Sequence, residues 1–324
     1  MPIKTALSGI LGIKHPILSA PMDGIAGARL TMAVSEAGGF GLLGGGYGEK
    51  DWLEQETAKL KSCAAPFGIG FITWSLARRP NLLDITLSAG PKAVMLSFGD
   101  PGPFAPRIKA AGALLICQVQ AEDMAKQALD AGADILVAQG TEAGGHGASR
   151  TTLDVVPAIV DLAAGRVPVA AAGGIADGRG LAAMMMLGAS GVLMGTRFYA
   201  SVECDGAEEA KKRICAATSG NSVRSIIFDL SRNNVWPAPF NGRCLINDHA
   251  RRWMGREVEL MQNVATVAAE YAAAKAAGNF DVAAVIAGEA VGLIHDIPPA
   301  AVIVDRIVTE ADQILRGRRN SAPA

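Results

Sequence analysis

The sequence predicts an α/β fold, a (β/α)8 TIM barrel with a smaller, mainly helical inserted domain. Three observations favour this fold. Short apolar runs of strand length recur through the first part of the chain, amphipathic segments separate them, and several of these segments end in Ala-Gly just before the next run. A glycine in the left-handed conformation commonly closes a helix at such a point. The spacing alone does not exclude an open doubly wound sheet.

The expected elements follow in order from residue 17. The strands are expected at residues 17–20, 40–43, 67–71, 93–98, 113–119, 134–138, 167–171 and 191–194. The clearest helices between them are expected at 28–37, 51–61, 121–131 and 178–187. Residues 39–44 match G-x-G-x-x-G, but they follow a helical stretch and contain a strand, whereas a dinucleotide-binding loop follows a strand and opens a helix. We therefore expect no dinucleotide site there.

The pattern changes after Ser201, where strands and helices no longer alternate. Residues 207–217 are expected to be helical, 225–230 extended, and 251–277 a long Ala-rich helix with one break allowed. Residues 288–294 contain two glycines and either reach the mouth of a site or form an ordinary helix-packing pair.

These features divide the chain into three parts. We expect the barrel at 1–203, a mainly helical substrate or lid domain at 204–297, and a C-terminal segment at 298–324. The last segment contains an amphipathic helix, residues 300–316, which should pack back on the barrel.

Composition limits the class of partner. The 324 residues suit one barrel of roughly 250 residues plus an insertion. Half of the residues are hydrophobic, 19% are charged and 38 are glycine, which suits a large core crossed by many tight turns. The net charge of −1 gives no electrostatic reason to bind nucleic acid or an anionic membrane. We expect small-molecule partners, and the sequence leaves a homo-oligomer open.

The cysteines and the apolar stretches predict a cytoplasmic protein. Five cysteines stand far apart and form no C-x-x-C pair, so neither a disulfide framework nor a zinc site is indicated. No basic segment followed by a long apolar stretch begins the chain, and the most apolar stretch, residues 181–194, is too short to span a bilayer.

The chemistry is expected at the end of the sixth strand. Residues 139–150 form a loop with glycines at 140, 144, 145 and 147, and His146 lies in its middle. Glycine allows such a loop to lie flat against a ligand with its N–H groups free to donate. Histidine can take or give a proton near neutral pH, so His146 is the candidate catalytic residue. The alternative is a histidine that only caps a loop carbonyl.

Two further strand ends predict a phosphate site. The seventh strand runs into Ala-Gly-Gly-Ile-Ala-Asp-Gly at 172–178, and the eighth into Met-Gly-Thr-Arg-Phe at 194–198. The loops after strands seven and eight of a barrel often bind phosphate through glycine N–H groups, a hydroxyl and a short helix. Thr196 supplies the hydroxyl, while Arg197 either adds charge or forms a surface ion pair.

Other polar or soft side chains stand near strand ends. Ala20, Pro21 and Met22 follow the first strand, and Met22 suits one face of a ring system. Gln118 interrupts the apolar run of the fifth strand, and Gln139 closes the sixth, so both amides should point into the barrel mouth. Core packing and a buried polar network are the alternatives for these residues.

The sequence lacks the residues that several kinds of catalysis need. No lysine stands at a strand end for a Schiff base, and neither H-E-x-x-H nor a cluster of carboxylates offers metal ligands. One histidine, several glycines and a phosphate site suit a bound redox cofactor that performs the difficult step.

The motifs at 139–146, 172–178 and 194–198, in this order, resemble those of the nitronate monooxygenase family, formerly called 2-nitropropane dioxygenases. The resemblance covers 16–200 and continues from 288 to the end. It implies a (β/α)8 barrel with a helical second domain, and FMN as the cofactor of the barrel. It places the FMN phosphate on Gly173, Gly174, Gly195 and Thr196. It places Ala20, Pro21, Met22, Gln118, Gln139, Gly144 and Gly145 around the isoalloxazine, and it matches His146 to the catalytic histidine. Family members often have Asn where this chain has Gly70, Lys in place of Gln118 and Asp in place of Gln139.

The resemblance implies oxidation of alkyl nitronates, such as propionate 3-nitronate, with O2 to a carbonyl compound and nitrite. His146 would stabilise the anion or remove the α proton of a neutral nitroalkane. An FMN-dependent enoyl-acyl-carrier-protein reductase, which uses NAD(P)H, resembles the chain at the same Glu-Ala-Gly-Gly-His motif and is the first alternative. A phosphate-binding barrel without redox activity is the second.

Overall fold

The computed structural model describes residues 3–234 and 236–317. Eight parallel strands form one sheet in the order β1-β9-β8-β6-β5-β4-β3-β2. They are β1 (Ile17–Ser19), β2 (Gly41–Gly46), β3 (Phe67–Ile72), β4 (Ala93–Ser97), β5 (Leu114–Val119), β6 (Ile135–Gln139), β8 (Val169–Ala172) and β9 (Gly191–Met194). A parallel bridge between Leu18 and Phe40 brings the first and last strands of this order together. The predicted barrel is confirmed, and each expected run overlaps one of its strands.

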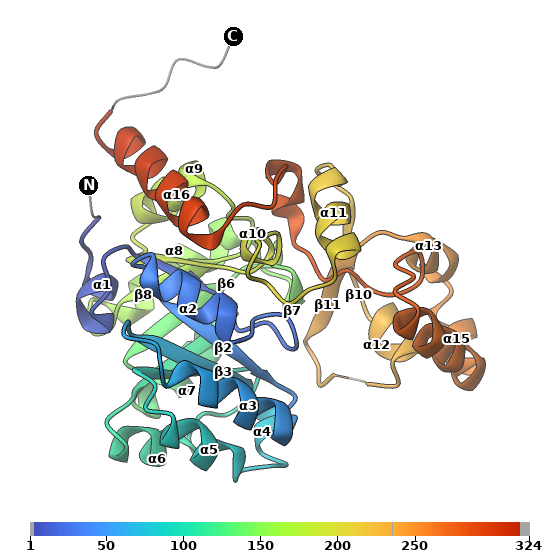
Figure 1. Cartoon of the computed structure of the whole chain (residues 1–324), viewed down its shortest axis with the longest axis horizontal. Coiled ribbons are helices and arrows are strands. Elements are labelled where there is room, and N and C mark those ends of the chain that lie inside the picture. The colour runs from blue at the N-terminus through green and yellow to red at the C-terminus, as the bar shows by residue number, and fades with distance from the viewer. Residues whose placement is uncertain (1–2, 235, 318–324) are drawn as a thin grey trace.

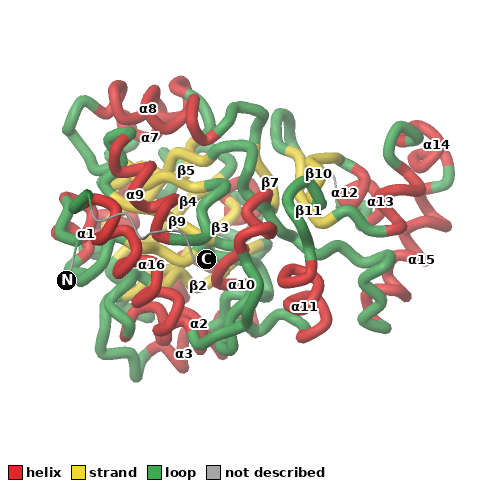
Figure 2. Tube along the Cα trace, turned by 90° about the horizontal axis from the view of Figure 1, so that it is seen from above, coloured by secondary structure: helices red, strands yellow, loops and turns green. Residues whose placement is uncertain are grey.

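Helices surround the barrel, as Figures 1 and 2 show. Those between the strands are α2 (Ala28–Glu36), α3 (Lys50–Leu60), α4 (Thr73–Leu76), α5 (Leu82–Ser88), α6 (Ala105–Ala110), α7 (Glu122–Asp130), α8 (Thr152–Ala163) and α9 (Gly178–Met186), and α10 (Thr196–Tyr199) follows the last strand. Successive strand residues point to opposite faces, so alternate residues fill the barrel and the others pack under the helices. The interior cluster includes Leu18, Met95 and Val137, and Leu7 and Leu11 of α1 (Ala6–Leu11) belong to it. The apolar face of α1 therefore closes the barrel interior.

The C-terminal helix α16 (Ala300–Leu315) packs against α9 and α2. Its Glu310 carboxylate accepts the N–H of Gly178 at 2.7 Å, at the first residue of α9. The expected helix at 300–316 is therefore confirmed. Residues 318–324 of the third predicted segment lie outside the described residues.

The inserted segment lies to one side of the barrel (Figure 1). It contains α11 (Glu208–Ala216), α12 (Ile227–Ser231), α13 (Asp248–Trp253), α14 (Glu257–Gln262) and α15 (Val264–Ala276), and it continues into the 3-10 helix η1 (Glu289–Leu293). Its strands β10 (Ser222–Ser225) and β11 (Asn241–Leu245) form a three-stranded antiparallel sheet with β7 (Gly145–Gly147). Because β7 belongs to the loop after β6, this sheet joins the insertion to the barrel mouth. The proposed domain boundaries stay a prediction.

Two expected elements of the insertion were wrong. Residues 225–230 were expected to be extended, but β10 ends at Ser225 and residues 227–230 belong to the helix α12. The Ala-rich region is broken twice rather than once. Met254 is extended at φ −56 and ψ 125, Gly255 is left-handed at φ +76, and Asn263 at φ −111 separates α14 from α15. Gly255 can take this left-handed conformation without the strain that a side chain would add.

Within the described ranges, no helix is both long enough and apolar enough to cross a membrane.

Candidate active site

His146 lies in β7 and is bound to an acid from the insertion. Its Nε2 is 3.0 and 2.9 Å from the two carboxylate oxygens of Asp229 on α12, and both side chains are buried. Asp229 also accepts a hydrogen bond from Arg232 at 2.5 Å. A carboxylate accepts, so Nε2 carries the proton of the neutral ring and Nδ1 holds the free lone pair. Within the described part of the chain, the hydrogen bonds of the His146 ring are those of Nε2 with Asp229, so Nδ1 is available to a ligand.

An aromatic side chain covers one face of the His146 ring. Trp236 stacks on it with ring centroids 3.4 Å apart and planes 5° apart. The Trp236 indole N–H donates to the Tyr47 hydroxyl at 2.8 Å. Phe98 packs edge-on against Trp236 at 5.0 Å. These contacts fix the plane of the imidazole and exclude water from one side of it.

Burial lowers the pKa of His146 below its ordinary value. The Asp229 carboxylate raises this pKa, whereas the positive charges of Arg232 and Arg224 lower it further. The ring is therefore neutral at neutral pH, which is the form that can accept a proton.

Arg224 on β10 holds the loop that carries His146. Its guanidinium donates to the Thr141 hydroxyl at 3.0 Å and to five backbone carbonyls, those of Thr141 (2.8 Å), Ala143 (2.9 Å), Gly145 (3.2 Å), Gly147 (3.3 Å) and Asn241. Burial lowers the pKa of Arg224 to about 10, so it stays charged at neutral pH. Arg243 on β11 also donates to the Thr141 carbonyl, at 2.8 Å, so two arginines of the insertion hold the loop that carries His146.

The loops expected to hold a phosphate come together at the barrel mouth. Gly173 and Gly174 have φ angles of +109° and +72°, which glycine adopts without strain. A methyl group on Gly195 would lie 3.5 Å from Cβ of Ala20 and 3.7 Å from the sulfur of Met22. The expected residues after the first and eighth strands are therefore neighbours.

Thr196 and the 288–294 segment meet at the same place. The Thr196 hydroxyl oxygen accepts the N–H of Gly288 at 2.9 Å, which leaves its proton free to donate. The N–H of Glu289 donates to the carbonyl of Glu142, and a methyl group on Gly144 would lie 2.7 Å from the nitrogen of Gly288. Of the two interpretations of 288–294, contact with the mouth of the site is observed.

The polar groups of the loops that contain Gly173, Gly195 and Thr196 suit a phosphate. Glycine backbone and a threonine hydroxyl line them, and the nearby Glu142 carboxylate accepts both the N–H and the hydroxyl of Thr152, at 2.8 and 2.7 Å. Arg197, the candidate extra charge, is buried and pairs with Asp296 at 3.0 Å. Its charge is therefore already compensated, and it lies inside the protein rather than on the surface.

The glutamines form a network that includes one residue not predicted. Gln139 Oε1 accepts from Gln118 Nε2 at 3.2 Å and from Gln120 Nε2 at 2.7 Å. Gln120 is buried, and its Oε1 has no partner among the described residues. The signal for Gln120 was weak because it follows the last strand residue, where polar side chains are common.

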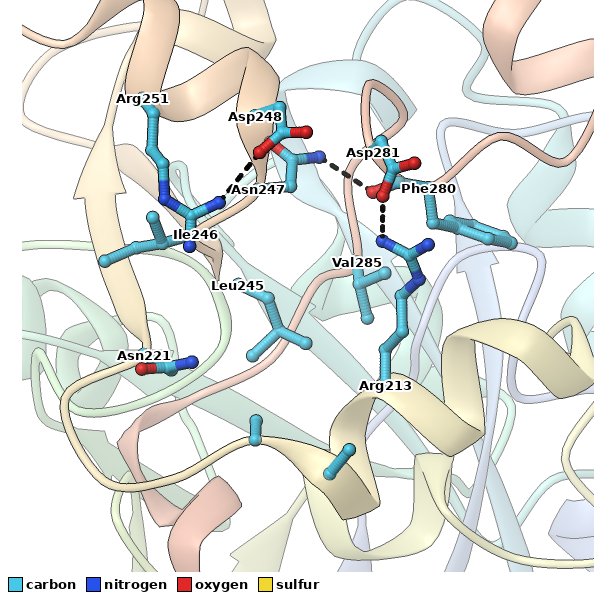
Figure 3. Close-up of a pocket in the computed structure, with 12 residues that line it drawn as sticks. Arg213, Asn221, Leu245, Ile246, Asn247, Asp248, Arg251, Phe280, Asp281 and Val285 are labelled. Carbon is cyan, nitrogen blue, oxygen red and sulfur yellow. Dashed lines mark hydrogen bonds and ion pairs between the residues drawn. The ribbon is translucent and has the colours of Figure 1, made fainter.

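A separate cavity of about 260 Å³ lies in the insertion (Figure 3). Arg213 and Arg251 line it, but Arg213 is 2.8 Å from Asp281 and Arg251 is 3.0 Å from Asp248. Both arginine charges are paired, and none of the expected site residues lines this cavity. This cavity is therefore separate from His146 and from the loops that are expected to bind phosphate.

Comparison with known proteins now identifies the family. The model of the nitronate monooxygenase family matches residues 4–81 and 73–310. The chain belongs to this family. It is therefore an oxidoreductase, and members of the nitronate monooxygenase family are generally flavin-dependent.

Relatives of two kinds match over nearly the whole chain. A nitronate monooxygenase of Metarhizium robertsii is 34% identical, with 92% of this chain and 91% of the relative covered. A (3aS,4S,5R,7aS)-5-hydroxy-7a-methyl-1-oxo-octahydro-1H-indene-4-carboxyl-CoA dehydrogenase of Mycobacterium tuberculosis is 28% identical, with 96% and 97% covered. The structure of FabK from Thermotoga maritima superposes with a TM-score of 0.85 and 30% identity, covering 97% and 98% of the two chains.

The glycine that replaces the family's frequent Asn is required by Pro21. A methyl group on Gly70 would lie 2.4 Å from Cγ and 2.5 Å from Cβ of Pro21. We expect Gly70→Ala to lower the free energy of unfolding by about 1–3 kcal/mol, measured by urea denaturation, because Pro21 must move. Gly9→Ala is the control, since a methyl group there meets no atom within 4 Å. Gly9 lies inside α1, so this change should leave the free energy of unfolding unchanged or raise it by up to about 1 kcal/mol. A Gly70→Ala variant as stable as the wild-type protein would show that Pro21 moves without cost.

The contact of Asp229 with Nε2 of His146 predicts that this carboxylate positions the imidazole. Asp229→Asn should lower kcat/KM for a neutral nitroalkane roughly 10- to 100-fold, because the imidazole loses its fixed tautomer and orientation. The Asp229 charge raises the pKa of His146, so the acid edge of the pH profile should also move to lower pH. Asp248→Asn, an exposed change on α13, is the control. An unchanged acid edge would contradict the role of Asp229.

Proposed function

We propose that this chain is an FMN-dependent nitronate monooxygenase that oxidises alkyl nitronates with O2 to a carbonyl compound and nitrite. The observation that carries the proposal is the His146 geometry, a buried neutral imidazole with Nε2 on Asp229 and Nδ1 free, in a chain of this family. A small nitronate and O2 are the partners that this function requires.

The residues at the barrel mouth fit FMN. Gly173, Gly174, Gly195 and Thr196 would hold its phosphate through backbone N–H groups and the free hydroxyl proton. Ala20, Pro21, Met22, Gln118, Gln139, Gly144 and Gly145 would border the isoalloxazine. When bound, FMN would supply the acceptor for the electrons that leave the nitronate.

His146 would act at Nδ1. As a neutral base it removes the α proton of a nitroalkane, and the resulting Nδ1–H then donates a hydrogen bond to the nitronate anion. Arg232, bound to Asp229, compensates the negative charge of that carboxylate. The Asp229 carboxylate, on the Nε2 side of His146, therefore does not repel an anionic substrate at Nδ1.

The test is the visible spectrum of the purified protein, recorded without oxygen before and after addition of a nitronate and with no nicotinamide present. We expect an oxidised flavin spectrum that the nitronate bleaches, and nitrite release once O2 is admitted. A flavin spectrum that the nitronate leaves unchanged but NADH bleaches would overturn the proposal.

A second candidate is the FMN-dependent enoyl-acyl-carrier-protein reductase. The similarity to FabK and to a relative named as a carboxyl-CoA dehydrogenase is the observation that favours this reductase. Consumption of NADH coupled to an enoyl thioester would support it. Membership of an oxidoreductase family gives no support to the barrel without redox activity.

A further inference from the structure

Gly242 of β11 lies directly under the hydrogen bond between His146 and Asp229. In the antiparallel sheet of β7, β11 and β10 (Figure 1), Gly242 is the cross-strand partner of His146. A methyl group on Gly242 would lie 3.5 Å from Nε2 of His146 and 3.8 Å from Oδ2 of Asp229. Directly opposed residues share one face of a sheet. The imidazole and its carboxylate partner therefore cover the face toward which a side chain at position 242 would point.

The backbone conformation of Gly242 does not require glycine. The described glycines with a positive φ do not include Gly242, so other residues could adopt its conformation. Glycine inside a strand costs free energy, because it loses more backbone entropy on folding and has no side chain to pack. What glycine contributes at this position is therefore the lack of a side chain, which is typical of places that other groups approach closely.

The Oδ2 atom of Asp229 is reserved for the histidine. Among the described residues its one hydrogen bond is with Nε2 of His146, at 2.9 Å, whereas Oδ1 also accepts from Arg232. The other cross-strand neighbour of Gly242 is Ser225, whose hydroxyl oxygen is buried and has no hydrogen-bond partner in the described part of the chain. This hydroxyl shares the sheet face with His146 but does not reach Asp229.

The charged groups around the imidazole come from α12 and β10. Burial lowers the pKa of His146, Asp229 raises it, and Arg232 and Arg224 lower it further. On β11, the Cys244 thiol is neutral, because burial raises its pKa to about 12. Of these groups, only Asp229 raises the pKa of the imidazole, so a second donor to its carboxylate would lower that pKa.

We propose that Gly242 is a positioning residue, which reserves the Asp229 carboxylate for the imidazole because it places no hydrogen-bond donor under the contact between His146 and Asp229. This inference rests on the proposed function, in which that imidazole is the base. Gly242 does not touch the reacting atoms and acts through the two side chains that lie over it.

Two variants that differ by one hydroxyl test this role. The methyl group of Gly242→Ala makes ordinary contacts at 3.5 and 3.8 Å, so His146 should titrate as in the wild-type protein. The hydroxyl of Gly242→Ser, one bond further out, comes within hydrogen-bond distance of Asp229 Oδ2 and competes with Nε2. The titration midpoint should then fall by roughly 0.5 to 1 pH unit, which corresponds to one hydrogen bond. Proton NMR of the Cε1–H resonance measures the midpoint, and His146→Gln assigns this resonance among the four histidines.

Ser225→Ala is the matched control, because it removes a hydroxyl from the same sheet face one strand away. This hydroxyl has no hydrogen-bond partner, so its loss should leave the midpoint of His146 unchanged. Equal midpoints in Gly242→Ser and Gly242→Ala, or a higher midpoint in Ser225→Ala, would overturn the proposal. Long-range ¹H–¹⁵N spectra of the wild-type protein add a test that needs no variant, since a neutral ring with its proton on Nδ1 would overturn the proposal as well.

The titrations need no turnover, so they separate this inference from the proposed function. If the expected midpoints are found in a protein that oxidises no nitronate, the proposed function fails and the role of Gly242 stands. If nitronates are oxidised, the acid edge of kcat/KM for a neutral nitroalkane should move in Gly242→Ser by the same amount as the midpoint. An acid edge that stays in place while the midpoint moves would contradict the proposed role of His146 as the base.

Discussion

Replacement of His146 by Gln is expected to lower kcat/KM for a neutral nitroalkane by roughly 10²- to 10⁴-fold. Glutamine can still form a hydrogen bond, but it cannot take the α proton. A preformed nitronate has already lost that proton, so its kcat/KM should fall much less. Steady-state nitrite release from the two forms of one compound measures this difference. His295→Gln is the control, because His295 is exposed. Equal losses for both forms would contradict the role of His146 as a base.

The pH profile of the wild-type protein tests the same role. Burial lowers the pKa of His146 below its ordinary value of about 6.5, and only the neutral ring can accept a proton. As the pH falls, the midpoint of the decline in kcat/KM for a neutral nitroalkane should therefore lie below 6.5. A midpoint above 6.5 would show that another group or a charged His146 is involved.

Arg224→Met is expected to lower the free energy of unfolding by about 3–5 kcal/mol. The change removes a donor from the carbonyls of Ala143, Gly145 and Gly147 in the loop that carries His146, and each buried carbonyl that loses its partner costs free energy. Urea denaturation followed by tryptophan fluorescence measures the loss.

Arg251→Met is the matched control for Arg224. Arg251 is exposed and has one ion pair, with Asp248, so its loss should change the free energy of unfolding by less than about 0.5 kcal/mol. A loss at Arg224 no larger than at Arg251 would show that water replaces the guanidinium at the loop carbonyls.

The barrel could be predicted because its signal is local. Parallel strands covered on both faces must be apolar along their length, and the helices between them alternate with them in sequence. The strand ends then indicated His146, Gln118, Gln139 and the glycine loops without any knowledge of distant residues. The structure brings these residues to one mouth; their roles stay a proposal.

The partners of these residues could not be predicted because they are distant in the chain. Asp229 is 83 positions from His146 and belongs to a segment that was expected to be extended. β7 consists of Gly-His-Gly, which has no strand pattern of its own and becomes a strand only by pairing with β11. Gln120 belongs to the site only through its hydrogen bond to Gln139, which the sequence does not show.

The pairing of β7 with β11 also affects the order of events during synthesis of the chain. His146 emerges from the ribosome well before Asp229 and Trp236. Its imidazole therefore lacks both its carboxylate partner and its stacking partner until those residues have been synthesised. Contacts of such sequence separation close a long loop and therefore form late. A nascent chain can complete most of its barrel before His146 has its partners, and the environment of this histidine is assembled only once the insertion has folded onto it.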